Sequence, residues 1–324
     1  RLFWKVQGAA RQTAYQIKGC VDGKEVYDTG KIESPEMNHK YGGELVSRNR
    51  VAWKVRLWDE ADSCGEWSEE AFFEMGLLNE KDWTAKWIDP EPAHNPEERQ
   101  PASYLKKEFE VERTGHARLY ITAHGVYDAY INGVKAGNFV LAPGTSQYDV
   151  RLQYQSYDVS SLLRQGKNEI VVTVGDGWWR GDTGYGGERN SFGTDLGLLC
   201  QLEIDKKTVL ASDGSWMASQ AGPLGHNDLM QGERYDARKE NICEWHPVTE
   251  RKNGYGNLVC SNSFDVVEKE CFTGKRIDTP NGGLVIDFGQ NIAGYTQLRL
   301  YAHEGQRITI YHGECLDQYG NFTR

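Results

Sequence analysis

One stretch of the sequence combines residue types that hold phosphates, metal ions and sugars. The segment VGDGWWRGDTGYGGERNSFGTD, residues 174–195, contains seven glycines, three aspartates and a Trp-Trp pair. A glycine-rich loop can cradle a phosphate, carboxylates can coordinate a cation, and an indole ring can stack on the apolar face of a pyranose. These three kinds of site imply three different proteins.

Phosphate binding is the weakest of the three interpretations. The sequence GDGWWRG resembles a dinucleotide fingerprint only superficially, because its third glycine comes one position late and no helix is expected after it. Trp178 and Trp179 would also obstruct the approach of a pyrophosphate. The net charge of -10 and the lack of a basic stripe argue against nucleic-acid partners.

An ion site is a stronger interpretation. Asp176, Asp182, Glu188, Asn190 and Asp195 carry the hard oxygen donors that calcium prefers, although their order matches no EF-hand loop. We predict Asp182 and Asn190 as calcium ligands if the loop holds an ion. No other cofactor is expected.

Sugar binding is the most specific interpretation. A pyranose offers an apolar face to an aromatic ring, and its hydroxyls pair with planar carboxylate, amide and guanidinium groups. The predicted sugar-binding residues are Trp179, Tyr185, Glu188, Arg189 and Asn190. An ordered structural loop, with glycines at positive φ and tryptophans packed against the sandwich edge, would explain the same residues.

Other candidate chemistry is sparse. The sequence contains no GxSxG, HExxH or Cys-His signature. Five histidines have no ligand-like spacing and are interpreted as structural: His124, His226, His246, His303 and His312. The sequence GERYDAR, residues 232–238, is interpreted as local ion pairing. No pair of acids can be placed at a catalytic separation, so no catalytic residue is assigned in this chain.

The elements around the loop are almost all predicted strands. Short alternating runs are separated by turn signals such as Asp22-Gly23 and Asn132-Gly133, whereas helical periodicity is nearly absent. No apolar run is long enough to span a membrane. The seven cysteines are odd in number and scattered, which favours a reducing compartment and a cytoplasmic location. The oligomeric state is not specified by the sequence.

Three domains are predicted, giving an all-β protein. Residues 1–78 fit a fibronectin type III-like sandwich, and residues 79–250 fit a jelly-roll-like sandwich with long strands and wide loops. Residues 251–324 are expected to begin a third β domain, with three strands in the segment GGLVIDFGQNIAGYTQLRLYAHEGQRITIYHGECL. Such a domain needs more strands to close a core, so it is expected to be truncated.

Taken in order, these segments resemble bacterial α-L-rhamnosidases. RQTAYQI, VAWKVRLWDEADSCGEWSEEAFFEMGLL and DWTAKWI resemble the fibronectin-like module of that family and its exit strand. LYITAHGVYDAYINGVKAG, LAPGTSQYDVRLQYQSYDVSSLL, GDGWWRG and GERYDAR resemble its jelly-roll module. VIDFGQNIAGYTQLRLYAHEGQRITIYHGECLDQYGNF resembles the opening of its third β module.

The resemblance implies a glycoside hydrolase acting on rhamnose-containing glycosides. In that family an inverting reaction takes place in an (α/α)6 barrel that follows the β modules, so this chain is expected to be an inactive N-terminal region. Some members bind a terminal rhamnose with calcium in the jelly-roll module. The alternatives are a stand-alone carbohydrate-binding or scaffolding protein and an adhesion-type array of β-sandwiches.

Overall fold

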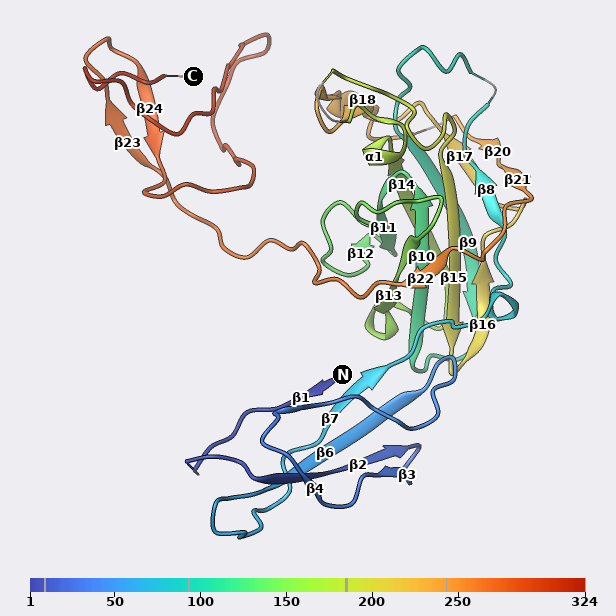
Figure 1. Cartoon of the computed structure of the whole chain (residues 1–324). Coiled ribbons are helices and arrows are strands. Elements are labelled where there is room, and N and C mark those ends of the chain that lie inside the picture. Colours follow the sequence, from blue (N-terminus) through green and yellow to red (C-terminus); the bar gives the residue numbers. More distant parts are fainter. Residues whose placement is uncertain (9, 93, 184–185, 243, 324) are drawn as a thin grey trace. The chain divides into compact units, whose positions relative to one another are not determined.

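The computed structural model describes residues 1–8, 10–92, 94–183, 186–242 and 244–323. The chain forms two compact units, Arg1–Val266 and Val267–Arg324. Strands make up nearly all of the regular structure, which confirms the predicted all-β class (Figure 1). Among the described residues, no helix is long and apolar enough to cross a membrane.

The first unit begins with a small sandwich. Its main sheet has the order β3-β2-β6-β7, with β4 also paired to β2, and a second sheet consists of β1 and β5. These strands are β1 (Leu2–Phe3), β2 (Ala14–Val21), β3 (Lys24–Asp28), β4 (Ile32–Glu33), β5 (Asn38–His39), β6 (Arg50–Trp58) and β7 (Ala71–Glu74). Val51 and Val55 of β6 are buried, and the Asp22-Gly23 turn with positive φ at both residues joins β2 to β3. The alternation and the hairpin are as predicted.

A larger sandwich follows, built from two sheets whose strands are mostly antiparallel. One has the order β21-β8-β15-β10-β13-β22, with β16 paired to β15, and the other has the order β12-β11-β14-β9-β17-β20. Strands of the first sheet are β8 (Trp87–Asp89), β10 (Ala117–His124), β13 (Leu152–Asp158), β15 (Gly197–Ile204), β16 (Lys207–Ala211), β21 (Thr249–Arg251) and β22 (Leu258–Cys260). Strands of the second are β9 (Ser103–Val111), β11 (Val126–Ile131), β12 (Val134–Lys135), β14 (Gly166–Gly175), β17 (Met217–Ser219) and β20 (His246–Pro247).

The core of the larger sandwich lies between these two sheets. Ile121 and Leu119 of β10 meet Val172 and Ile170 of β14 in one buried apolar cluster. Period-two alternation along β14 buries Ile170, Val172 and Val174, while Val171 and Thr173 lie on the half-buried opposite face. The predicted Asn132-Gly133 turn joins β11 to β12.

Short elements complete this sandwich. The turn α1 (Gly177–Arg180) and the hairpin β18 (Leu224–Asp228) to β19 (Gly232–Tyr235) lie at one end of it (Figure 1). The 3-10 turns are η1 (Glu80–Asp82), η2 (Ser160–Leu162) and η3 (Ala237–Lys239). The helix α1 corrects the expectation that no helix follows the GDG sequence, although it is a single turn of four residues.

The small and the large sandwich share several buried contacts. Arg48 forms two hydrogen bonds of 2.6 Å with the carboxylate of Glu203 on β15. The Tyr154 hydroxyl on β13 accepts from the Leu77 amide and donates to the Leu77 carbonyl. Strand β22 pairs in parallel with β13, so residues 258–260 belong to the larger sandwich. The domain boundaries at residues 78 and 250 remain sequence-based predictions.

The second unit has little regular structure. Within its described residues, only β23 (Lys275–Asp278) and β24 (Leu284–Asp287) pair as strands. The predicted strands within residues 295–312 are therefore wrong for this structure, and apolar side chains such as Leu298 and Ile310 lie exposed. An alternating pattern becomes a strand only where neighbouring strands accept its backbone hydrogen bonds.

Candidate functional site

The glycine-rich loop begins where β14 ends. Asp176 starts a single helical turn, α1, in which Gly177 has a φ of 53°. A Cβ atom on Gly177 would lie 2.5 Å from Cγ1 of Val126, and one on Gly181 would lie 2.4 Å from the Gly177 carbonyl oxygen. These glycines allow the backbone to approach itself closely, so they have a structural cause unrelated to phosphate binding.

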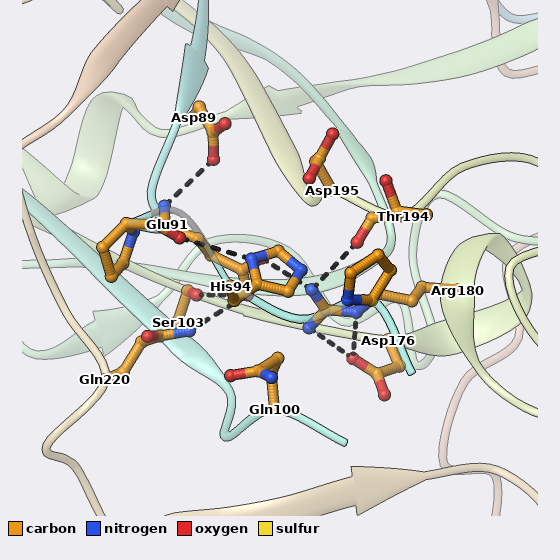
Figure 2. A network of polar contacts seen from close by, with 12 residues as sticks. Asp89, Glu91, His94, Gln100, Ser103, Asp176, Arg180, Thr194, Asp195 and Gln220 are labelled. Carbon is orange, nitrogen blue, oxygen red and sulfur yellow. Dashed lines mark hydrogen bonds and ion pairs between the residues drawn. The ribbon is translucent and has the colours of Figure 1, made fainter. Parts of the chain in front are cut away.

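A buried ion-pair network fixes one side of this loop (Figure 2). The Arg180 guanidinium contacts Glu91 at 2.6 Å through Nη1 and Asp176 at 2.7 Å through Nη2. All three side chains are at most 2 % exposed. Burial raises the pKa of Asp176, although the neighbouring Arg180 cation opposes this rise. Two buried carboxylates thus share one buried cation, which balances their charge only in part.

The Glu91 carboxylate has further partners. Its Oε1 atom accepts hydrogen bonds from the Ser103 hydroxyl at 3.2 Å and from the Gln220 amide at 3.1 Å. The His94 ring lies 3.6 Å from Oε2 of Glu91 (Figure 2). Glu91 lies in the Pro- and Glu-rich sequence after β8, and these contacts tie it to the larger sandwich.

A second ion-pair network surrounds Asp182. Nη2 of Arg99 donates to both oxygens of Asp182 at 2.8 Å, and Nη1 donates to Asp228 at 2.9 Å. Burial alone would raise the pKa of Asp228, but hydrogen bonds from backbone amides and from Arg99 outweigh it and hold that pKa below its usual value. Arg189 adds a longer contact of 3.8 Å to Asp182.

These contacts bear on the predicted calcium site. Both Asp182 oxygens are occupied by Arg99, and the Asn190 amide donates to the Pro96 carbonyl at 3.3 Å. A calcium ion at Asp182 would therefore have to displace a guanidinium. Within the described parts of the chain, no group of three or more His, Cys, Asp or Glu side chains is arranged to hold a metal ion. The calcium site remains a sequence-based prediction.

The described members of the predicted sugar-binding set have different surroundings. Trp179 packs into the sandwich, whereas Glu188 is exposed and Arg189 donates to the Glu97 carbonyl at 3.3 Å. Nη2 of Arg189 and Oδ1 of Asn190 are buried without a hydrogen-bond partner. Tyr185 lies outside the described residues. Sugar binding by this set stays a sequence-based prediction.

Trp179 lines a pocket that the sequence did not suggest. This pocket has a volume of about 430 Å³ and is lined by Trp87, His124, Tyr148, Asp149, Trp179, Asn253, Gly254, Gly256 and Asn257. Three aromatic side chains form its wall, and a carboxylate and two side-chain amides border it. This is the mixture of apolar and hydroxyl-binding groups that a sugar requires.

The pocket is assembled from segments far apart in the sequence. Trp87 comes from β8, His124 ends β10, and Trp179 lies on α1. Indole Nε1 of Trp179 donates to the Asp195 carbonyl at 3.0 Å, which fixes the ring. The Asn257 side-chain amide donates to the Tyr148 carbonyl at 2.7 Å, which links the segment around Tyr148 and Asp149 to residues 253–257. The adjacent Trp178-Trp179 pair was the only signal of this pocket in the sequence.

Comparisons with known proteins agree with the order of these sandwiches. A family model described as "Rha78A-like, N-terminal immunoglobulin domain" matches residues 1–79. "Alpha-L-rhamnosidase N-terminal domain" matches residues 112–268, and "Bacterial alpha-L-rhamnosidase concanavalin-like domain" matches residues 277–324.

Relatives and solved structures give the same family. An α-L-rhamnosidase from Alteromonas sp. (strain LOR) is 32% identical over 97% of this chain, which spans 37% of that protein. The structure of the Aspergillus terreus α-L-rhamnosidase matches 88% of this chain and 36% of its own, with a TM-score of 0.79 and 31% identity. That of the Dictyoglumus thermophilum enzyme has a TM-score of 0.73 and 32% identity over 89% of this chain and 36% of its own. The chain thus spans little more than a third of the relatives that it matches, and it belongs to the α-L-rhamnosidase family as an N-terminal β-domain region.

Proposed function

We propose that the whole protein to which this chain belongs releases terminal α-L-rhamnose from glycosides, and that this chain supplies none of the catalytic groups. The relatives that it matches are α-L-rhamnosidases, and the chain spans only 37% of the first of them. The reaction would be an inverting hydrolysis in an (α/α)6 domain. There one carboxylic acid protonates the leaving oxygen and a second carboxylate activates water.

The carboxylates of this chain support a non-catalytic role. Among the described residues, five carboxylates are buried: Glu91, Asp176, Asp182, Glu203 and Asp228. Each of them pairs with an arginine. A general acid must exchange a proton with the substrate, whereas each of these five carboxylates is engaged by a guanidinium group.

Hydrolysis of 4-nitrophenyl α-L-rhamnoside tests whether catalysis requires parts of the protein outside residues 1–324. We expect no release of nitrophenol by residues 1–324 and clear turnover by the full-length protein. Measurable turnover by residues 1–324 would contradict the non-catalytic assignment. No turnover by the full-length protein on this or a natural rhamnoside would contradict the proposed activity.

We further propose that the Trp179 pocket holds a terminal sugar of the substrate. The observation that carries this proposal is that Trp87, Tyr148 and Trp179 line the same pocket as the exposed residues Asp149 and Asn253. Carboxylate and amide groups pair with vicinal hydroxyls, while ring edges exclude water from the apolar face. A stand-alone binding or scaffolding protein is not favoured, because the matched relatives are enzymes.

Isothermal titration with methyl α-L-rhamnoside tests the pocket in residues 1–324. We expect Asp149→Ala to weaken binding about tenfold, because one hydrogen bond to a charged group is lost. Asn190→Ala, which alters the site predicted from the sequence, should leave affinity unchanged. The reverse pattern would place the sugar at Glu188, Arg189 and Asn190. No heat at millimolar sugar, with or without calcium, would exclude both sites.

A further inference from the structure

The His124 ring is stacked between the indole rings of Trp87 and Trp179. Its centroid lies 4.1 Å from that of Trp87, with planes 15° apart, and 3.9 Å from that of Trp179, with planes 5° apart. The side chain ends β10 and is 8 % exposed, yet it lines the pocket. Stacking on both faces prevents the ring from tilting, so the directions of its two nitrogens are fixed.

The two ring nitrogens have different surroundings. Nδ1 is buried and has no hydrogen-bond partner. It faces Gly197, the residue opposite His124 on β15, where an added Cβ would lie 3.2 Å from Nδ1. Nε2 is not among the buried atoms that lack a partner. Because His124 lines the pocket while its Nδ1 is buried against Gly197, we take the ring edge that carries Nε2 to be the one on the pocket side.

This difference assigns the proton. A neutral imidazole has one N–H donor and one bare acceptor nitrogen. A proton on Nδ1 would be a buried donor without an acceptor, whereas a bare Nδ1 lone pair can pack against the CH₂ of Gly197 at lower cost. The proton therefore belongs on Nε2, where solvent or a ligand can accept it.

The ring also stays uncharged. Burial lowers the pKa of His124 to about 3, and the nearby Arg251 cation lowers it further in the same direction. Arg251 itself pairs with Asp89 and, at 3.5 Å, with Asp195. Asp149 is the charged residue among those that line the pocket. An N–H donor without a formal charge recognises an oxygen acceptor and rejects a cationic ligand.

We propose that His124 is a specificity-determining residue of the pocket, which donates a hydrogen bond from Nε2 to a ring or hydroxyl oxygen of an uncharged sugar. The proposal rests on the proposed binding of a sugar in the same pocket. It adds the ligand class, since Asp149 accepts from sugar hydroxyls while His124 and the Asn253 amide donate to sugar oxygens. The stack on Trp87 and Trp179 sets the direction of the His124 donor.

The tautomer can be measured in the free protein. Long-range ¹H–¹⁵N correlation spectra of residues 1–324 should show His124 with a protonated Nε2 and a bare Nδ1 at pH 7.5. The same pattern should persist at pH 5. A protonated Nδ1, or a titration of this ring near pH 6.5, would overturn the assignment. This readout does not depend on whether any sugar binds.

Two variants then test the donor. His124→Phe keeps an aromatic ring between the indoles but removes the donor, so affinity for methyl α-L-rhamnoside should fall about tenfold in calorimetric titration. His124→Gln keeps an N–H donor and should lose less affinity than His124→Phe. Equal affinities of the wild type and His124→Phe would overturn the role of His124 alone. No binding by the wild type would overturn the sugar site together with that role, while the tautomer assignment would stand.

The wild type offers a measurement that does not depend on how the variants fold. Saturating methyl α-L-rhamnoside should shift the Nε2 resonance of His124 and leave that of Nδ1 unchanged. A sugar that binds without shifting Nε2 would overturn the proposal. His39, which hydrogen-bonds two tyrosines in the small sandwich, provides an internal reference whose resonances should not respond.

Discussion

Replacing Arg180 with methionine should destabilise the larger sandwich by about 4 kcal/mol at pH 7. Methionine keeps much of the side-chain length but removes the cation between Glu91 and Asp176, both at most 2 % exposed. Breaking a buried ion pair by removing one partner costs about 3–5 kcal/mol, because the remaining charge stays buried and unpaired. Here two carboxylates lose their cation, but Glu91 keeps its bonds from Ser103 and Gln220, so a value within that range is expected.

The loss should depend on pH with a defined sign. In the variant, burial raises the pKa of Asp176 without an opposing cation, so its folded-state value lies above the unfolded one. A carboxyl of this kind contributes stability below its unfolded pKa, and that contribution is lost as pH rises through the folded pKa. The difference between wild type and variant should therefore be smaller at pH 5 than at pH 7.

Urea unfolding followed by tryptophan fluorescence measures both quantities. Arg238→Met is the matched control, because it removes an arginine that pairs with Asp236 while 89 % exposed, and such solvent-screened surface pairs contribute little to stability. A loss below about 1 kcal/mol for Arg180→Met at pH 7 would refute the reasoning. An equal loss at pH 5 and pH 7 would refute the argument that buried carboxylates carry the cost.

The remaining predictions concern three other positions. Arg48→Ala should lower the free energy of unfolding by about 3 kcal/mol, because it leaves the buried Glu203 carboxylate without its cation beside a pocket of about 380 Å³. Because Arg48 joins the two sandwiches, they should then unfold in separate transitions in calorimetry. Gly177→Ala should cost about 2 kcal/mol in urea unfolding, since its φ is positive and its Cβ would clash, whereas Gly254→Ala should be neutral. Burial lowers the folded-state pKa of His124 to about 3, so between about pH 6.5 and pH 3 the unfolded chain binds a proton that the folded chain does not. The free energy of unfolding should therefore fall as pH drops below about 6.5, by at most about 5 kcal/mol. His124→Phe should remove this contribution to the pH dependence of the free energy of unfolding.

Local signals in the sequence were sufficient for much of the fold. The Asp22-Gly23 and Asn132-Gly133 turns both adopt positive φ at their two residues and join adjacent strands. The sequence alternates apolar and polar residues over 51–57, and the apolar Val51 and Val55 on β6 are both buried. Such features are decided within a few residues, so they survive without knowledge of the rest of the chain.

Features that need distant partners were not predictable in this way. The alternating residues 295–312 do not form strands, because among the described residues of that unit only β23 and β24 supply partners to each other. Arg99, which occupies Asp182, lies 83 positions from it in the sequence. The loop therefore looked like a calcium ligand set, although both oxygens of its Asp182 accept from an arginine that no local pattern connects to it.

The same separation explains why little in the sequence pointed to this pocket. Sugar binding by Trp179 stays a prediction from its own chemistry, and His124 was interpreted as structural because its spacing to other histidines carries no ligand signal. What makes His124 a candidate is its position between Trp87 and Trp179, which depends on the pairing of β10 with β15 and of β15 with β8. The glycine that leaves room for its ring, Gly197, is 73 residues away.

Consecutive residues on α1 connect the ion-pair network to the pocket. Trp179 stacks on His124, and Arg180 turns into the buried network with Glu91 and Asp176. A single helical turn has too few hydrogen bonds to be stable by itself, so its position must be set by these side chains. The network of Arg180 with Glu91 and Asp176 therefore helps to position Trp179 beside His124. Asp176, one of the carboxylates that first suggested an ion site, lies in that network, whereas the polar side chains that line the pocket come from other segments.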